Sequence, residues 1–205
     1  MKEHFVITVG REYGSGGRAI AKLVAQKLNV PFYDKELLTL AAQKSGICQE
    51  IFEHNDEKTT VSDMLPVTAG TGFGAGVGLG LQMPMNQRVF LAQFEVITNL
   101  AKEQSCVIVG RCADYVLRDM DHVTHIFLYA SLEKRVERIM RLEHVDADKA
   151  RELIRKTDKQ RKSYYNFFAD GNWGVRSNYD LMLSTDDHTP EEIAEMIIAY
   201  AHPGK

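Results

Sequence analysis

Closely spaced glycines near the start of the chain could build a site for a phosphate group. Gly10 follows a run of β-prone residues, and Gly14, Gly16 and Gly17 precede an amphipathic segment with helical periodicity. A strand, a glycine loop and a helix in this order let backbone N–H groups converge on an anion, and the helix N-terminus adds positive partial charge. The pattern predicts a phosphate-binding loop over residues 10–18.

This loop departs from the usual P-loop pattern, G-x-x-x-x-G-K-[ST]. Gly10 and Gly16 are one residue too far apart, and Gly17 stands where the lysine is expected. Arg18 follows it and is either the cation of a variant phosphate loop or a solvated residue in the first turn of a helix; we favour the phosphate role. Ser15 could reach a magnesium ion, although many loop serines bond only to backbone.

Arginines further along the chain suit the transfer of a phosphoryl group. That reaction depends on positioning and on cations aimed at the transferring oxygens, and the planar arginine fork binds phosphate oxygens in pairs. Arg111 follows a buried apolar run and a glycine, and we favour a phosphate role for it. In the basic segment 148–168, Arg155, Asp158 and Arg161 share one helical side. This helix either closes over a triphosphate or presents a solvated face.

Alternating strands and helices must position these residues. Apolar runs predict strands at 5–9, 31–34, 106–109, 125–130 and 181–184, and helical periodicity predicts helices that end near 28, 45, 103, 143, 168 and 201. Such alternation indicates an α/β fold with a parallel sheet covered by helices on both faces. Ligands bind at the carboxyl ends of parallel strands, where the glycine loop, Asp34, Arg111 and Ser131 are all expected.

Composition and charge are those of one globular domain. The chain has 205 residues, 44% of them hydrophobic and 26% charged, and a formal net charge of −3. The absence of a basic excess argues against binding to nucleic-acid polymers. Three cysteines without motif spacing indicate a reducing compartment, and neither a signal peptide nor an apolar run long enough for a membrane is visible. We expect a soluble, cytoplasmic protein that does not interact with membranes.

Two further stretches allow both a functional and a structural interpretation. Glycines alternate over residues 70–80, which are either part of a mobile substrate-binding insert or a flexible surface loop. An aromatic cluster could stack on a base, but such spacing is more often packing, which we favour. Its members are Tyr164, Tyr165, Phe167, Phe168 and Trp173.

Together these segments resemble the cytidylate kinase-like family of P-loop proteins. The resemblance covers almost the whole chain except the glycine-rich stretch and rests on GREYGSGGR, FYDKELL, VIVGRCADYVL, IFLYAS, DKQRKSYY and WGVRSNYDLMLST. It implies a three-layer P-loop NTPase fold of the nucleoside monophosphate kinase type, as a single domain over residues 1–205. It further implies a five-stranded parallel core, a mobile substrate-binding insert at about 35–87 and a helical lid at about 146–170.

The chain departs from true cytidylate kinases at positions that bear on catalysis. Gly17 and Ala19 replace the loop lysine and the metal-binding hydroxyl residue, and Val109 replaces an acidic residue. Leu40 stands where an arginine that contacts the monophosphate is expected. The phosphate-binding frame is retained, namely Gly14, Ser15, Gly16, Asp34, Gly110, Arg111, Asp158 and Arg161.

We therefore expect a kinase that transfers the γ-phosphoryl group of ATP, with Mg²⁺, to a small nucleotide such as CMP. The residues expected to bind ATP are Gly10, Gly14, Ser15, Gly16, Gly17 and Arg18, with Ser15 also at the metal. Asp34 and Arg111 are expected to bind the acceptor. The residues expected to act on the transferring group are Arg18, Arg111, Arg155, Asp158 and Arg161, with Asp158 orienting one of the last two arginines.

Two other functions stay open. A nucleotide- or anion-binding regulatory protein with a degenerate loop would explain the missing lysine and the alanine at position 19. A kinase for a non-nucleotide metabolite would use the same phosphate frame. The sequence also leaves open whether the protein is a homo-oligomer.

Overall fold

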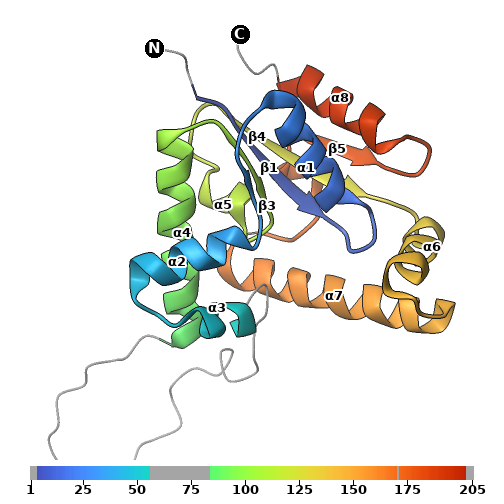
Figure 1. The fold of residues 1–205 in the computed structure, drawn as a ribbon, viewed down its shortest axis with the longest axis horizontal. Helices are drawn as coiled ribbons and strands as arrows, with labels where there is room; N and C mark the ends of the chain where they lie inside the picture. Colours follow the sequence, from blue (N-terminus) through green and yellow to red (C-terminus); the bar gives the residue numbers. More distant parts are fainter. Residues whose placement is uncertain (1–3, 56–83, 170, 202–205) are drawn as a thin grey trace, which may run out of the picture.

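The computed structural model describes residues 4–55, 84–169 and 171–201. Within them, five parallel strands form one sheet in the order β2-β3-β1-β4-β5 (Figure 1). The strands are β1 (Val6–Arg11), β2 (Phe32–Tyr33), β3 (Cys106–Val109), β4 (Val123–Tyr129) and β5 (Leu181–Ser184). All five predicted strands are confirmed. β1 runs two residues past its predicted end because Gly10 and Arg11 pair in register with Phe127 and Leu128 of β4.

Helices cover both faces of the sheet. They are α1 (Gly17–Leu28), α2 (Glu36–Ser45), α3 (Gln49–Asn55), α4 (Met85–Glu103), α5 (Ala113–Val116), α6 (Leu132–Glu143), α7 (Ala147–Phe168), the 3₁₀ turn η2 (Arg176–Asn178) and α8 (Pro190–Ala201). α1 and α8 pack on one face against Ile7 and Val9, whereas α2 and α4 pack on the other against Val6. This is the predicted three-layer α/β architecture of a P-loop NTPase fold.

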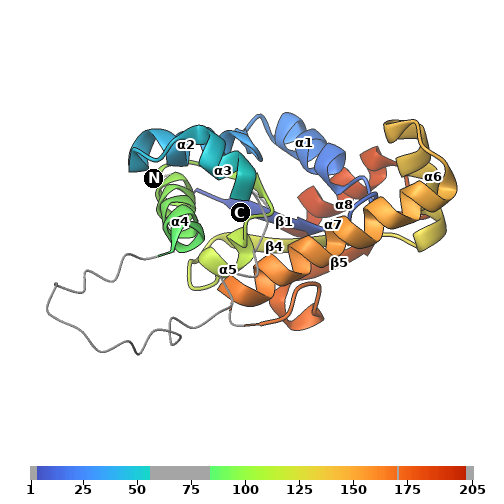
Figure 2. The ribbon, with the colours of Figure 1, turned by 90° about the horizontal axis from the view of Figure 1, so that it is seen from below.

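α7 lies across the carboxyl edge of the sheet, with α6 at one end of it (Figures 1 and 2). α6 and α7 share an apolar cluster that includes Val136, Ile139, Ala150 and Ile154. The segment predicted as a lid at 146–170 contains α7. The predicted lid is therefore one long helix, and it lies at the sheet edge where the candidate site is expected.

The aromatic residues of α7 pack rather than form an open stacking surface. The Phe168 ring stacks on Phe90 of α4 with centroids 4.2 Å apart, and Tyr164 is buried beside them. Trp173 packs edge-on against Phe127 at 5.4 Å. The packing interpretation of this cluster is confirmed.

Part of the predicted insert cannot be compared with the structure. α2 and α3 occupy the first part of the range 35–87, and the alternating glycines at 70–80 lie outside the described residues. The division into one domain with an insert and a lid therefore stays a prediction. None of the helices in the described ranges is long and apolar enough to cross a membrane.

Candidate functional site

The glycine loop between β1 and α1 has the shape of an anion cradle. Gly14 and Gly16 adopt left-handed conformations, with φ of 85° and 82°, which cost a glycine little. Gly16 caps α1 without a side-chain hydrogen bond. The first N–H groups of any helix lack intrahelical acceptors, so the start of α1 can offer its N–H groups to a ligand.

Ser15 holds this loop together from within. The residue is fully buried, and its hydroxyl donates to the carbonyl oxygen of Glu12 at 2.9 Å. Ser15 Oγ also accepts a hydrogen bond from the Gly17 N–H at 3.3 Å, and the Ser15 carbonyl accepts one from Thr185 Oγ1 at 2.7 Å. Binding of Mg²⁺ by Ser15 stays a prediction, and it would require the buried hydroxyl oxygen to become accessible.

A cavity of about 510 Å³ opens beside the loop. It is bounded by the loop, the first turn of α1, α6 and the segment after β5, and its volume is typical of a small-molecule site. Its charged lining is mostly basic, with Arg11, Arg18, Lys22, Arg138, Arg141 and Arg161 against Glu12 and Glu143. Such a lining suits a polyanion such as a triphosphate.

Two arginines of α6 bind the loop directly, and sequence reasoning missed both. Arg138 Nη1 donates to the Gly14 carbonyl at 2.6 Å, and Arg135 Nε donates to the Tyr13 carbonyl at 2.9 Å. Arg135 is buried and also pairs with Glu12 at 2.9 Å. The three-residue spacing of Arg135, Arg138 and Arg141 places them on one helical side after residue 131, but that spacing is equally typical of a solvated face.

Asp158 of α7 binds the loop and α6. Its Oδ1 accepts from the Tyr13 N–H at 2.8 Å, and its Oδ2 pairs with Arg135. Of its predicted partners, Arg161 donates to the Arg11 carbonyl at 3.3 Å, and exposed Arg155 lines another cavity against α6, which Asp158 also lines. Arg161 thus reaches the loop cavity, whereas a role for Arg155 stays a prediction that requires α7 to move.

Asp34 and Arg111 meet at the ends of β2 and β3, as their positions after neighbouring strands predicted. Both side chains are buried, and Arg111 Nη1 binds Asp34 Oδ1 and also donates to the Val109 carbonyl at 3.1 Å. Arg18, which is 61% exposed, binds Asp34 Oδ2 through Nε at 2.5 Å. Burial alone would raise the pKa of Asp34, but the charge of Arg111 and the hydrogen bonds from both arginines hold it below its usual value. Asp34 is therefore ionised at neutral pH.

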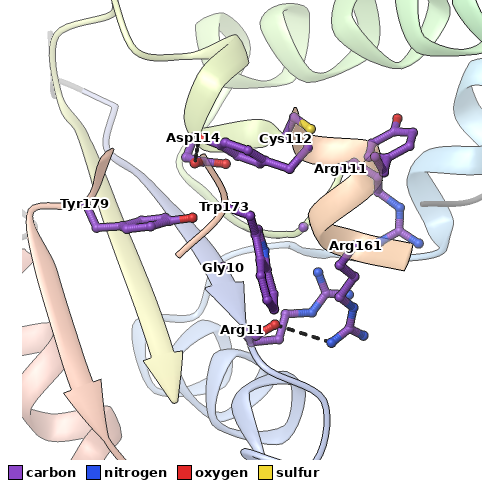
Figure 3. A pocket seen from close by; sticks show the side chains of 11 residues that line it. Gly10, Arg11, Arg111, Cys112, Asp114, Arg161, Trp173 and Tyr179 are labelled. Carbon is purple, nitrogen blue, oxygen red and sulfur yellow. Dashed lines mark hydrogen bonds between the residues drawn. The ribbon is translucent and has the colours of Figure 1, made fainter. Parts of the chain in front are cut away.

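A second, small pocket of about 20 Å³ lies between the ends of β1 and β3 and the last turns of α7. In Figure 3 the guanidinium groups of Arg11, Arg111 and Arg161 gather at one end, and Asp114 and Tyr179 lie at the other. Burial raises the pKa of Asp114 to about 6, although a 2.8 Å hydrogen bond from the Tyr165 hydroxyl acts in the opposite direction. Asp114 belongs to the motif VIVGRCADYVL but was not singled out from the sequence.

The chain matches a known protein family over most of its length. A sequence model of the cytidylate kinase-like family matches residues 6–187. The chain belongs to the cytidylate kinase-like family. A cytidylate kinase from Archaeoglobus fulgidus is 23% identical over 197 residues, which cover 94% of this chain and 92% of that protein.

Solved structures share the fold of this cytidylate kinase-like protein. An uncharacterized protein from Eubacterium ventriosum is 28% identical, with a TM-score of 0.71, and the match covers 97% of this chain and 99% of that one. A shikimate kinase from Bacteroides thetaiotaomicron has a TM-score of 0.54 at 15% identity, covering 97% and 98%. At that identity the likeness shows the fold alone.

The family implies ATP and usually Mg²⁺, and the residues present fit both. The left-handed glycines and the N-terminus of α1, whose cap residue Gly16 makes no side-chain hydrogen bond, suit a chain of phosphates. Among the described residues no cluster of three or more His, Cys, Asp or Glu side chains could hold a metal ion. Mg²⁺ commonly binds through substrate phosphates and water with only one or two carboxylates. The site therefore fits a metal ion that would be held mainly by phosphate oxygens and water and would neutralise phosphate charge.

Proposed function

We propose that the protein transfers the γ-phosphoryl group of ATP to a small acceptor, and that a nucleoside monophosphate such as CMP is the first acceptor to test. The observation that carries the proposal is the meeting of two features at one sheet edge. The basic cavity at the glycine loop lies next to the ion pair of Asp34 and Arg111. A donor nucleotide and an acceptor bound there would face each other across the ends of β1, β2 and β3.

The roles follow from the geometry of each group. The N–H groups at the start of α1 would bind the triphosphate, and Arg161 of α7 would neutralise charge as the phosphoryl group moves. Arg111 would bind an anionic part of the acceptor. Asp34, ionised and fixed by two arginines, would orient the acceptor hydroxyl or phosphate. Positioning and charge supply most of the catalysis in this type of reaction.

A non-nucleotide acceptor is the second candidate, and one observation favours it. Leu40, which stands where an arginine for the monophosphate is expected, packs against the apolar core of α2 and α4. That position therefore offers no cation to an acceptor phosphate. An acceptor with a carboxylate in place of the phosphate would still suit Arg111, because arginine binds both anions in the same bidentate way.

One assay distinguishes a nucleotide kinase, a kinase for a non-nucleotide acceptor and a regulatory binding protein. Purified protein would be assayed for ADP formation from Mg-ATP with each common nucleoside monophosphate and with a panel of small hydroxy acids and sugars. ATP binding would be measured by calorimetry. Acceptor-dependent ADP formation supports the proposal and identifies the acceptor class. ATP binding without turnover for any acceptor would indicate a regulatory nucleotide-binding protein, and failure to bind ATP would contradict both kinase proposals.

Two matched variants test whether Arg111 binds the acceptor. Arg111→Met should abolish acceptor-dependent turnover because the acceptor loses its cation. Arg118→Met is the control, since Arg118 is a half-exposed arginine near Asp119 that lines neither cavity of the candidate site. Equal activity of the two variants would contradict the acceptor role of Arg111.

A further inference from the structure

The start of α1 has no room for a side chain at the position of the usual loop lysine. A Cβ atom added to Gly17 would lie 2.7 Å from Arg11 Cβ, 3.4 Å from Arg11 Cγ and 3.3 Å from Ser15 Oγ. Carbon atoms without a bond between them make favourable contacts only at about 3.5–4.0 Å. The stem of Arg11 therefore fills the space in which a side chain on residue 17 would begin.

Arg11 reaches this space from the opposite side of the loop. It is the last residue of β1, and its backbone is fixed by pairing with Leu128 of β4 and by the hydrogen bond from Arg161. The residue is only 8% exposed, yet it lines both the loop cavity and the small pocket beside Arg111. Its charge also contributes to the lowered pKa of Asp34. Arg11 is thus a buried cation that borders the loop cavity and also lies near Arg111 and Arg161 in the small pocket (Figure 3).

Arg18, the substitute predicted from the sequence, is placed differently. Its side chain is largely exposed, its Nε is held by Asp34, and it lines the loop cavity but not the small pocket. The loop cavity would hold the donor, and the small pocket contains Arg111, which is proposed to bind the acceptor, so a cation between the two groups must line both cavities. Arg11 and Arg161 both line the two cavities, but Arg161 comes from α7; of the two arginines that flank the loop, Arg11 lines both and Arg18 lines one.

We propose that Arg11 supplies the cation that a lysine supplies in the usual loop, and that it binds the β- and γ-phosphates of ATP from the strand side. This inference rests on the proposed function and adds a residue to its site. Residue 17 must then be glycine because the side chain of Arg11 occupies the space beside it, and the absence of a lysine there is not a loss of the catalytic cation. A guanidinium can bind two phosphate oxygens at once and keeps its charge when buried.

The first test compares single variants of the full chain. Arg11→Met keeps the aliphatic stem and removes the charge, so it should bind Mg-ATP and inorganic tripolyphosphate at least about tenfold more weakly by calorimetry. Arg118→Met should bind both as the wild type does. Arg18→Met should lose less affinity than Arg11→Met. An Arg11→Met protein with wild-type affinity, or a larger loss in Arg18→Met, would overturn the inference.

The second test exchanges the cation between the two positions and does not depend on the folding of Arg11→Met. Gly17→Lys alone should lower the melting temperature and impair ATP binding, because the new side chain meets Arg11. The double variant Arg11→Gly, Gly17→Lys removes this clash and should bind ATP at least about tenfold more tightly than Arg11→Gly alone. No gain from the added lysine would overturn the inference.

The outcomes also separate this inference from the proposed function. A wild-type protein that binds neither ATP nor tripolyphosphate would contradict both. A wild-type protein that binds ATP and turns it over, with Arg11 variants that do so equally well, would leave the proposed function standing and remove only the role of Arg11.

Discussion

The buried carboxylate of Asp34 at the end of β2 binds the buried guanidinium of Arg111 at the end of β3, while Arg18 covers the pair from the solvent side. The two buried partners lie 77 residues apart in the chain and meet because β2 and β3 are neighbours in the sheet. The pair keeps a fixed negative and a fixed positive group at the edge where ligands of parallel sheets bind.

Removing the negative partner should destabilise the protein. Asp34→Asn leaves Arg111 buried without its carboxylate, and breaking such a pair costs about 3 kcal/mol. Arg18→Met removes an exposed partner and should cost no more than about 1 kcal/mol. Urea denaturation followed by circular dichroism measures both. If both variants lose a similar amount of unfolding free energy, burial does not determine how much the Asp34–Arg111 pair contributes to stability.

Asp114 should make stability fall as the pH rises from about 4 to about 6. Its pKa in the folded protein is about 6, against about 3.9 in an unfolded chain. The folded state therefore binds the proton more tightly in this window, and the penalty of about 3 kcal/mol is fully present above it. Asp34, whose pKa is lowered, acts in a separate window: its contribution is present above about pH 4 and is lost below it.

Asp114→Asn tests this pH dependence. The amide oxygen can still accept the hydrogen bond from Tyr165, but the group no longer ionises. The variant should match the wild type near pH 4 and should be more stable at pH 7, as urea denaturation at both values would measure. A constant difference across this range would contradict the assignment.

Gly14→Ala should separate backbone strain from packing in the loop. Gly14 has a φ of 85°, and an added Cβ would lie 3.1 Å from both Arg135 Cβ and the Arg135 carbonyl oxygen. Gly46 at the end of α2 has a φ of 68°, and no atom of the described residues comes within 4 Å of its added Cβ. Gly46→Ala should cost about 1 kcal/mol for the backbone conformation alone. Gly14→Ala should cost about 1–3 kcal/mol more, because it also overpacks the loop against α6.

The fold was predictable because its signals are local. Each strand is a short apolar run bounded by polar or turn residues, so five strands and their alternation with helices followed from the sequence. The meeting of Arg18, Asp34 and Arg111 followed from one more rule, that parallel strands end at the same edge. Neither step needed knowledge of side-chain packing.

The rest of the site depends on contacts that sequence spacing cannot show. The basic residues of α6 resemble a solvated face until Arg135 and Arg138 are seen to bind the loop. Asp158 and Arg161 share a side of α7, but Asp158 forms an ion pair with Arg135 of α6. The predicted strand ends before Arg11. In the structure β1 includes Arg11 because it pairs with Leu128 of β4, and such a non-local interaction cannot be seen in the sequence.

Asp158 should be needed for both the stability of the loop and the binding of ATP. Asp158→Ala removes the acceptor of the Tyr13 N–H and one of the two carboxylates that bind Arg135, and we expect a loss of about 2 kcal/mol in unfolding free energy. ATP affinity should fall several-fold, because the loop backbone before Gly14 loses its anchor on α7. Asp148→Ala is the matched control on the same helix, since the Asp148 side chain is 97% exposed and pairs only with Arg151 among the partners resolved in the described residues. Denaturation and calorimetry on both variants decide the matter. If the two variants behave alike, α7 does not support the loop through Asp158.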